Sequence, residues 1–277
     1  MKSFIADKNR KLTKLALYHI EDLSYSSLLK ALRKKDVKVN GKRVNSDVTL
    51  TVGDLVEVYY TPNTIEKYTK IYTDENVAVI YKKSGYLSEV VFEALKDEYP
   101  TARFIHRLDR NTDGVMIFAL NDMAEESLIK GFKERYFDKK YHAVVKGVPK
   151  QKSAILSAYL LKDKDAATVT VLDKKVDGAV PIKTGYTVME DRGDTALLEV
   201  TLYTGKTHQI RAHLAYIGHP IIGDGKYGDF ETNEQKGVKA QMLTAYSLTL
   251  NFDKASPLNY LDKKTFVYSK GSFPKSD

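Results

Sequence analysis

The chain contains no cysteine and no tryptophan. Without cysteine it can form no disulfide bond, thiolate nucleophile, iron-sulfur cluster or Cys-type zinc site. It also has no apolar segment near the roughly 18 residues that a membrane span requires, and its first residues contain no apolar core of signal-peptide length. We therefore expect a soluble cytoplasmic protein that does not bind a membrane.

The composition of the 277 residues is that of an ordinary globular protein, with 43% hydrophobic and 29% charged residues. The net charge is +8 and is unevenly placed. Residues 1–60 hold 12 Lys and Arg against 7 Asp and Glu, whereas the other 217 residues hold 32 against 29. The basic N-terminal part indicates a polyanionic partner. The alternative is that the basic excess only aids solubility.

Sequence patterns predict a small N-terminal domain over residues 1–61. Apolar residues at helical spacing, beginning at Leu12 and again at Leu28, predict two short amphipathic helices. Alternating apolar residues around the Asn-Gly pair at 40–41 predict a small hairpin sheet after these helices, with strands at 37–39 and 55–59. The expected local order is therefore helix, helix and sheet.

Pro62 ends this pattern, because proline cannot donate to a strand ladder. We expect a linker at 62–70 and a second domain at 71–277. Strand patterns outnumber helical patterns in this second domain, which predicts a sheet-centred α+β fold rather than alternating βαβ units. The predicted elements are strands at 76–81, 143–145, 168–171, 186–188 and 197–202, and a helix at 122–135 with Leu128, Ile129 and Phe132 directed inward.

Two motifs that suggest a cofactor or a metal lack the context they require. Residues 223–228 match the dinucleotide fingerprint, but Pro220 precedes them and no clear amphipathic helix follows. His208 and His213 are five residues apart and do not share a helical face as a zinc pair does. For both histidines, packing in the core is an equal alternative to a direct role. We expect no cofactor and no metal.

Two segments remain as candidates for chemistry. In residues 104–114, Asp109 lies among His106, Arg107 and Arg110, just before an apolar run. A carboxylate with basic neighbours at the start of a buried strand is typical of functional sites, although a surface ion cluster is the alternative.

The second segment, residues 205–214, has densely placed hydrogen-bond donors between apolar residues. His208, Gln209, Arg211 and His213 supply them. This pattern suits the binding of a phosphate or a carboxylate in a partly dry cleft.

Together the two segments resemble the RluA-type family of pseudouridine synthases, whose hallmarks are His-Arg-Leu-Asp-x-x-Thr-x-Gly and Gly-Arg-Thr-His-Gln-Ile-Arg-x-His-Leu. A third family element lies between them, at Lys139-x-Tyr141-x-Ala143-x-Val145-x-Gly147. Residues 1–61 are similar to the small RNA-binding domain named after ribosomal protein S-four. The chain departs from the usual patterns at Tyr25, Lys83, Asp113 and Lys206. These departures bear on substrate identity and RNA affinity more than on chemistry.

The resemblance implies that the chain isomerises uridine to pseudouridine in structured RNA, with ribosomal RNA expected rather than transfer RNA. It implies a monomer that needs no cofactor. Asp109 is the implied essential carboxylate, which attacks either the uracil ring or the anomeric carbon of the ribose. Arg211 is its implied partner, and Tyr141 stacks on the uracil and handles the proton that leaves carbon five.

The implied substrate-binding residues are Arg107, Ile210, His106 and Lys139. Because the target base is stacked inside RNA, it must be flipped out. Arg107 would fill the vacated place and Ile210 would pack against the second face of the base. His106 and Lys139 lie beside these residues in the motifs and would contact the RNA.

Two alternatives stay open. One is an RNA-binding chaperone or assembly factor with a degenerate catalytic domain, against which the presence of Asp109, Tyr141 and Arg211 argues. The other is a glycosidase with two carboxylates, which needs a second acid near Asp109, such as Asp113 or Asp224.

Overall fold

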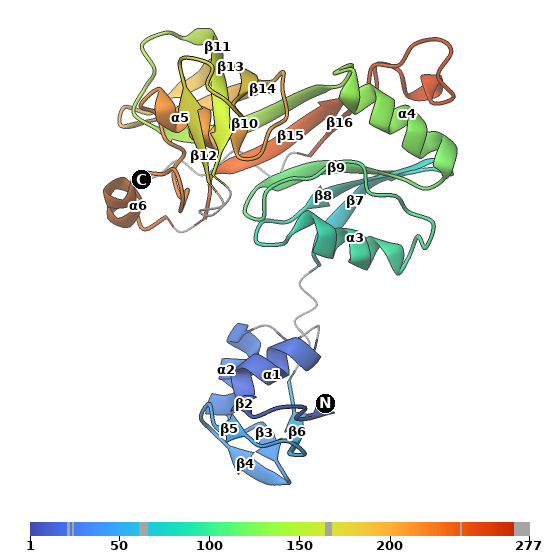
Figure 1. Ribbon diagram of the computed structural model, residues 1–277, viewed down its shortest axis with the longest axis vertical. Helices are drawn as coiled ribbons and strands as arrows, with labels where there is room; N and C mark the ends of the chain where they lie inside the picture. Colours follow the sequence, from blue (N-terminus) through green and yellow to red (C-terminus); the bar gives the residue numbers. More distant parts are fainter. Residues whose placement is uncertain (21–22, 24, 61–65, 164–167, 239, 269–277) are drawn as a thin grey trace. The chain divides into compact units, whose positions relative to one another are not determined.

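The chain forms two compact units, Met1–Glu66 and Lys67–Asp277 (Figure 1). The computed structural model describes residues 1–20, 23, 25–60, 66–163, 168–238 and 240–268. Residues 62–65 of the predicted linker lie outside the described residues. β7 (Tyr68–Thr73) begins inside the range 62–70 and belongs to the second unit, because it pairs with β8 (Val77–Lys82).

The described residues of the first unit form two helices and two small sheets. Four strands form one sheet in the order β1-β6-β3-β4, and β2 pairs with β5. Leucines of both helices, Leu12 and Leu28 among them, pack with Val37 and Val56 in one core. The elements are β1 (Lys2–Ile5), β2 (Arg10–Lys11), α1 (Leu12–His19), α2 (Tyr25–Arg33), β3 (Val37–Val39), β4 (Lys42–Val44), β5 (Thr49–Leu50) and β6 (Leu55–Val58).

The predicted helices and the Asn-Gly turn of this unit are confirmed. Asn40 and Gly41 both have positive φ, 51° and 77°, as a type I′ turn requires. The strand that follows this turn is β4, which the sequence pattern did not distinguish from the turn, and β3 pairs with both β4 and β6. β1 was not predicted, because Phe4 is its one buried residue and it shows little alternation.

The second unit is built on a ten-stranded sheet in the order β12-β11-β13-β14-β10-β15-β9-β8-β7, with β16 beside β15. The α+β prediction is confirmed. β9 and β15 are parallel and the other neighbours are antiparallel. The remaining elements are α3 (Ser88–Lys96), β9 (Asp113–Ala119), α4 (Asp122–Lys133), β10 (Asp138–Lys146), β11 (Ser153–Lys162), β12 (Val169–Leu172), β13 (Val180–Asp191), β14 (Thr195–Leu202), α5 (Gln209–Tyr216), α6 (Phe230–Gln235), β15 (Leu243–Thr249), η1 (Asn259–Leu261) and β16 (Thr265–Val267).

Helices cover both faces of this sheet. Since successive side chains of a strand point to opposite faces, Ala78 and Ile80 of β8 enter one core and Val77 and Val79 enter another. α3 and α5 pack in the first core, whereas α4 and η1 pack in the second. Figure 1 shows α3 and α4 on either side of β7, β8 and β9. Every residue of β8 is consequently buried.

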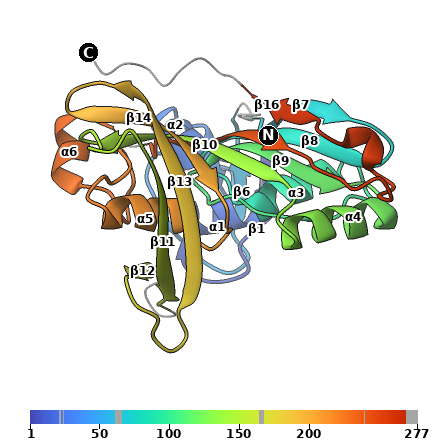
Figure 2. The ribbon, with the colours of Figure 1, turned by 90° about the horizontal axis from the view of Figure 1, so that it is seen from above.

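The elements predicted in the second unit are present with different lengths, whereas α3, α5, α6, η1 and the strands β7, β11, β15 and β16 were not predicted. α4 confirms the helix at 122–135, and the side chain of Asn121 caps it by accepting the backbone N–H of Ala124 at 2.9 Å. The inward direction of Ile129 is wrong, since its side chain is 46% exposed. β10 and β13 extend well beyond the predicted strands, and Figure 2 shows β11 and β13 projecting from the rest of the sheet. None of the described helices is long and apolar enough to cross a membrane.

Candidate active site

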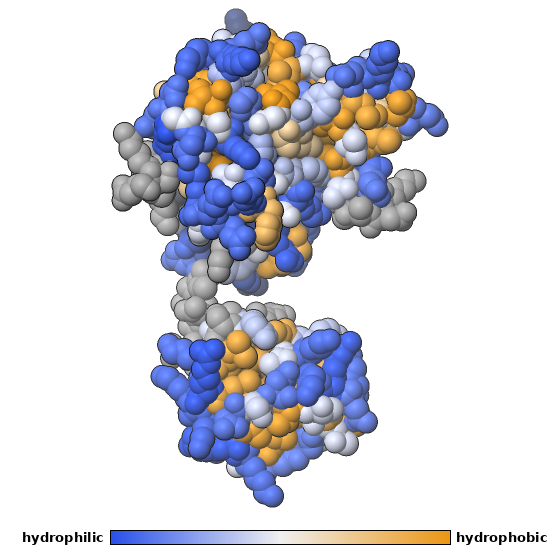
Figure 3. Space-filling view, turned by 90° about the vertical axis from the view of Figure 1, so that its left-hand side faces the viewer, coloured by the Kyte–Doolittle hydropathy of each residue, from blue (hydrophilic) through white to orange (hydrophobic). Residues whose placement is uncertain are grey.

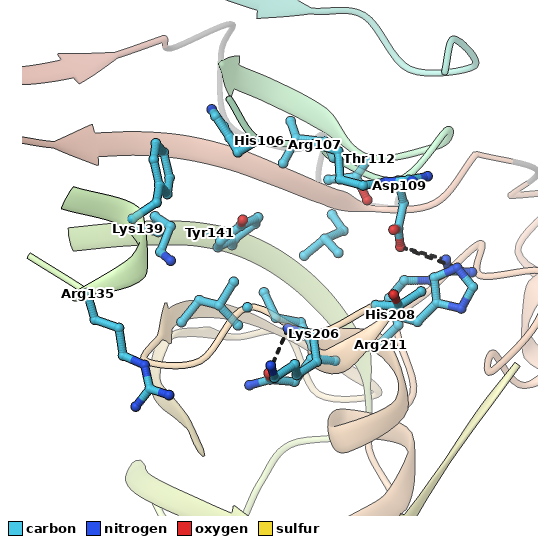
Figure 4. A pocket seen from close by; sticks show the side chains of 18 of the residues that line it. His106, Arg107, Asp109, Thr112, Arg135, Lys139, Tyr141, Lys206, His208 and Arg211 are labelled. Atoms are coloured by element: carbon cyan, nitrogen blue, oxygen red, sulfur yellow. Dashed lines mark hydrogen bonds and ion pairs between the residues drawn. The ribbon is translucent and has the colours of Figure 1, made fainter. Parts of the chain in front are cut away.

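A pocket of about 540 Å³ in the second unit is lined by four main segments, one of which is the end of α4 with the residues that follow it, at 132–135. Its other walls are the loop before β9, the strand β10, and residues 205–211 at the start of α5 (Figure 4). This volume is typical of sites that enclose a small molecule or a single nucleoside. All seven predicted site residues line it: Asp109, Tyr141, Arg211, Arg107, Ile210, His106 and Lys139.

Arg211 joins two carboxylates at the floor of the site. Its Nη1 donates to Asp109 Oδ2 at 2.8 Å, and its Nε and Nη2 donate to Asp224 at 2.7 Å and 2.9 Å. Burial tends to lower the pKa of Arg211, but the hydrogen bonds and charge of Asp224, and then those of Asp109, raise it overall. Arg211 is therefore a permanent cation at this position.

Asp224 is the residue that positions Arg211 from behind. Its side chain is 0% exposed, and it also accepts the backbone N–H groups of Lys226 and Tyr227 at 2.8 Å and 3.1 Å. Burial acts to raise the pKa of Asp224, yet these hydrogen bonds and the charge of Arg211 lower it overall. The sequence pattern marked Asp224 only as a possible second acid, and its contact with α5 was missed.

The loop that carries Asp109 is held from beneath by Lys82. This side chain is fully buried, and its ammonium donates to the carbonyl oxygens of Lys83, Tyr86 and Arg110 at 3.1, 2.8 and 3.0 Å. Burial lowers the pKa of Lys82 to about 8 against the opposing charges of Asp113 and Asp109. Ser88 of α3 adds a reciprocal pair of hydrogen bonds with the backbone of Leu108. Asp109 therefore projects from a fixed turn.

Tyr141 lies on β10 where the pairing with β15 shifts register, between Lys140 and Tyr141. Its ring is buried in the first core and also lines the pocket. Burial, and then the negative charge of Asp109, raise the pKa of the Tyr141 hydroxyl well above its usual value. The residue is a neutral phenol at physiological pH.

His106 is a structural acceptor. Its Nε2 accepts the backbone N–H of Ile117 at 3.1 Å, and its ring stacks on Phe132 with centroids 4.6 Å apart. Burial, together with the charge of Lys139, lowers the pKa of His106 to about 3, so the ring is neutral. These contacts fix the segment before Asp109 and leave the ring edge at the pocket wall.

Cationic side chains surround the pocket. Arg107 is 64% exposed and pairs with Glu89 at 3.2 Å, whereas burial and then Arg135 lower the pKa of Lys139. Three further cations that the sequence analysis did not select as site residues also line it: Lys133, Arg135 and Lys206. Lys133 and Arg135 lie far from Lys206 in the sequence, so the sequence pattern did not show that they line one pocket. The rim consequently suits an anionic ligand.

The two-carboxylate alternative does not fit this geometry. Asp113 accepts from the hydroxyls of Tyr81 and Thr244 and is not among the residues that line the pocket. Asp224 is held as an anion by Arg211, so it cannot serve as the second acid.

His213 and Gly223, from the other two motifs, have structural roles. His213 is buried, contacts Thr184 Oγ1 at 3.0 Å, and burial lowers its pKa to about 4. A short helix, α6, does follow the fingerprint-like segment, but a Cβ at Gly223 would lie 2.0 Å from the carbonyl oxygen of Ala240. Close backbone packing therefore explains this glycine. Among the described residues, no group of three His, Asp or Glu side chains is placed to hold a metal ion.

Comparisons with known proteins agree with this site. Residues 76–216, which include most of the pocket, match the family described as RNA pseudouridylate synthase. The chain is 33% identical over 236 residues to ribosomal large subunit pseudouridine synthase C of Escherichia coli (strain K12), covering 76% of this chain and 73% of that protein. The protein of the same name from Pasteurella multocida (strain Pm70) is 30% identical over 276 residues, covering 90% and 84%.

The fold is shared with a solved human structure as well. Human RNA pseudouridylate synthase domain containing 1 superimposes with a TM-score of 0.61 and 26% identity, over 76% of this chain and 92% of that one. The chain belongs to the RNA pseudouridylate synthase family, as its sequence motifs predicted. The comparisons favour an RNA pseudouridine synthase and give no support to the chaperone alternative.

Proposed function

We propose that the protein converts uridine to pseudouridine in ribosomal RNA of the large subunit. The observation that carries this proposal is the contact between Arg211 and Asp109 in a pocket that Tyr141 also lines. The names of the bacterial relatives support ribosomal RNA as the substrate.

The proposed reaction needs a nucleophile, a cation held in a fixed position beside it, and apolar side chains that exclude water from the base. The bond between N1 of uracil and C1′ of ribose breaks, the ring turns, and C5 bonds to C1′ while C5 loses a proton and N1 gains one. No atom or electron is gained or lost, so the chain's own groups suffice. Asp109 attacks either the uracil ring or C1′, the bond that it forms breaks again by the time the product is complete, and Arg211 holds its carboxylate in place.

Tyr141 and Ile210 hold the base in this proposal. Both side chains line the pocket and belong to the first core, which limits their movement. A phenol ring and an aliphatic side chain can enclose a flipped base between them. The raised pKa of Tyr141 favours stacking on the base as a neutral phenol. Its hydroxyl can relay the C5 proton towards N1, giving up its own proton as it accepts that one, so that the ring stays neutral.

The cationic rim receives the RNA backbone. Arg107 is exposed at the rim and able to enter the space that the flipped base leaves, while Lys139 and Arg135 contact phosphates. His106 acts through the loop before Asp109, because its Nε2 is already occupied by the backbone of Ile117.

The first unit is proposed as an RNA-binding domain similar to that of ribosomal protein S-four. Figure 3 shows apolar side chains among hydrophilic ones on one face of this unit. At the end of α2, four neighbouring cations are exposed: Lys30, Arg33, Lys34 and Lys35. We define these four residues as the α2 basic cluster and propose that it binds phosphates of the RNA. We also propose that the protein acts as a monomer in the cytoplasm.

Pseudouridine mapping in cells tests the proposal. Total RNA is mapped from cells that lack the gene and from the same cells carrying either the wild-type gene or Asp109→Asn. We expect one site in ribosomal RNA to be lost and restored by the wild-type gene alone. An unchanged map, once a redundant enzyme has been ruled out by double deletion, would contradict the proposal.

A further inference from the structure

We propose that His208 is a positioning residue for Asp109: a neutral imidazole, oriented by Tyr227, that presents its Nε2–H to the Asp109 carboxylate. His208 lines the pocket, and its Nε2 lies 3.9 Å from Asp109 Oδ2. This is the same oxygen that accepts from Arg211. The inference rests on the proposed function, because it gives His208 a role in that reaction.

A chain of hydrogen bonds sets the tautomer of His208. The backbone N–H of Val169 donates to the Tyr227 hydroxyl at 2.8 Å, and that hydroxyl lies 2.9 Å from His208 Nδ1. Among the described contacts of this hydroxyl, Nδ1 is the one acceptor for its proton. Nδ1 therefore accepts, and the ring proton is on Nε2, the nitrogen that faces Asp109.

The backbone of His208 supports a role for its side chain. His208 precedes α5 with φ of 53°, in the left-handed region that few residues other than glycine adopt, and among those few asparagine, aspartate and histidine are enriched. Its carbonyl accepts the N–H of Ala212 at 2.9 Å, so this conformation begins the helix that carries Arg211. The side chain is only 14% exposed. A strained position filled by a ring that faces the reacting carboxylate points to a function of that ring.

Charges of both signs surround His208. Asp109 and Asp224 favour the protonated ring, whereas Arg211 and Lys226 oppose it, and the Tyr227 hydroxyl faces Nδ1. Burial is the largest influence and lowers the pKa of His208 overall. A neutral donor can orient the carboxylate without neutralising it. The 3.9 Å separation is longer than a hydrogen bond, and such contacts in empty sites shorten when substrate binds.

Single-turnover kinetics of the full-length protein test this inference. The measurement is tritium release from RNA labelled at C5 of uridine, from pH 5.5 to 8.5, with RNA affinity measured in parallel. His208→Gln places an N–H near the Nε2 position, whereas His208→Asn tolerates the left-handed backbone but is too short. We expect His208→Asn to be about 10-fold slower with unchanged RNA affinity, and His208→Gln to be within about 3-fold of wild type.

Tyr227→Phe tests the inference through the pH dependence of the rate, which a purely packing role of His208 would leave unchanged. Without the hydroxyl, the neutral ring loses a hydrogen bond, so the pKa of His208 rises and the acid limb of the rate profile moves to higher pH. His219→Asn serves as the control, since His219 lies outside the pocket with Nδ1 near the carbonyl oxygen of Lys146. The inference would be overturned if the rate fell equally in both His208 variants or did not fall in His208→Asn. It would also be overturned if the acid limb of the rate profile stayed at the same pH in Tyr227→Phe.

Nitrogen-15 NMR of the full chain separates this inference from the proposed function. The His208 signals are assigned by their absence in His208→Asn, and we expect a neutral ring protonated on Nε2 at pH 7. A ring protonated on Nδ1 would overturn the inference whatever the activity. Wild-type protein that releases no tritium, with the expected His208 tautomer, would instead contradict the proposed function.

Discussion

Arg211 and Asp224 form a two-point ion pair in the interior of the second unit, with Nε–Oδ2 and Nη2–Oδ1 distances of 2.7 and 2.9 Å. The pair leaves Nη1 of Arg211 directed at Asp109, 2.8 Å away. Because two of its nitrogens are held from behind, the guanidinium cannot turn away from Asp109. Asp224 thus determines the direction of the cation that faces Asp109.

Asp224→Asn should reduce both stability and activity. The substitution leaves Arg211 buried with one carboxylate fewer, and breaking a buried pair by removal of one partner costs about 3–5 kcal/mol. We expect a loss of that order in urea unfolding, and tritium release at least about 10-fold slower in the folded fraction.

Asp194→Asn is the matched control for this prediction. Asp194 pairs with Lys236 but its side chain is 67% exposed, so its loss should change stability far less than the loss of Asp224. If Asp224→Asn were as stable and as active as this control, the positioning of Arg211 by Asp224 would be wrong.

Local patterns predicted both helices and the turn of the first unit, α4 and several strands. They missed α3, α5 and the strands β7, β11 and β15, and they could not give the long-range pairing. The turn at Asn40 and Gly41 follows from the two residue types, and α4 follows from its apolar spacing and its cap. The parallel pairing of β9 with β15 joins residues far apart in sequence. A local hydrophobic pattern carries no information about such a pairing.

The candidate site shows the same limit. The motifs predicted Asp109, Tyr141 and Arg211, and the structure brings all three to one pocket. The contact of Asp224 with Arg211, and of Tyr227 with His208, depends on how the loop after α5 folds back. Ile129 was misplaced because an apolar residue at the edge of a helix stripe can face either the core or solvent.

Lys82 should make stability depend on alkaline pH. Its pKa is about 8 when folded, below the ordinary value of 10.5, so the unfolded chain binds more protons between these values. The penalty for burying the charged ammonium is therefore fully present below pH 8 and is relieved as the pH rises towards 10.

Lys82→Met checks this sign. We expect the free energy of unfolding of wild type, measured relative to Lys82→Met at each pH, to rise between pH 7.5 and 9.5. Taking the difference cancels the titration of the other groups, including tyrosines whose raised pKa acts in the opposite direction at higher pH. A constant or falling difference would show that Lys82 is not buried as a cation.

The α2 basic cluster should contribute RNA affinity rather than chemistry. Replacing Lys30, Arg33, Lys34 and Lys35 with Gln removes four exposed cations. Each lost phosphate contact should flatten the slope of log affinity against log salt by about 0.7 to 0.9. Affinity should fall, while the single-turnover rate at saturating RNA stays the same. Loss of that rate in a folded variant would contradict this division between the two units.

The central claim is that Asp109, held by Arg211, performs the isomerisation. The most direct measurement is tritium release from ribosomal RNA labelled at C5 of uridine, with wild type and Asp109→Asn at equal RNA occupancy. The account predicts release and pseudouridine formation by wild type, and at least a roughly 1000-fold slower reaction by Asp109→Asn with RNA binding unchanged. Comparable release by both proteins would contradict it.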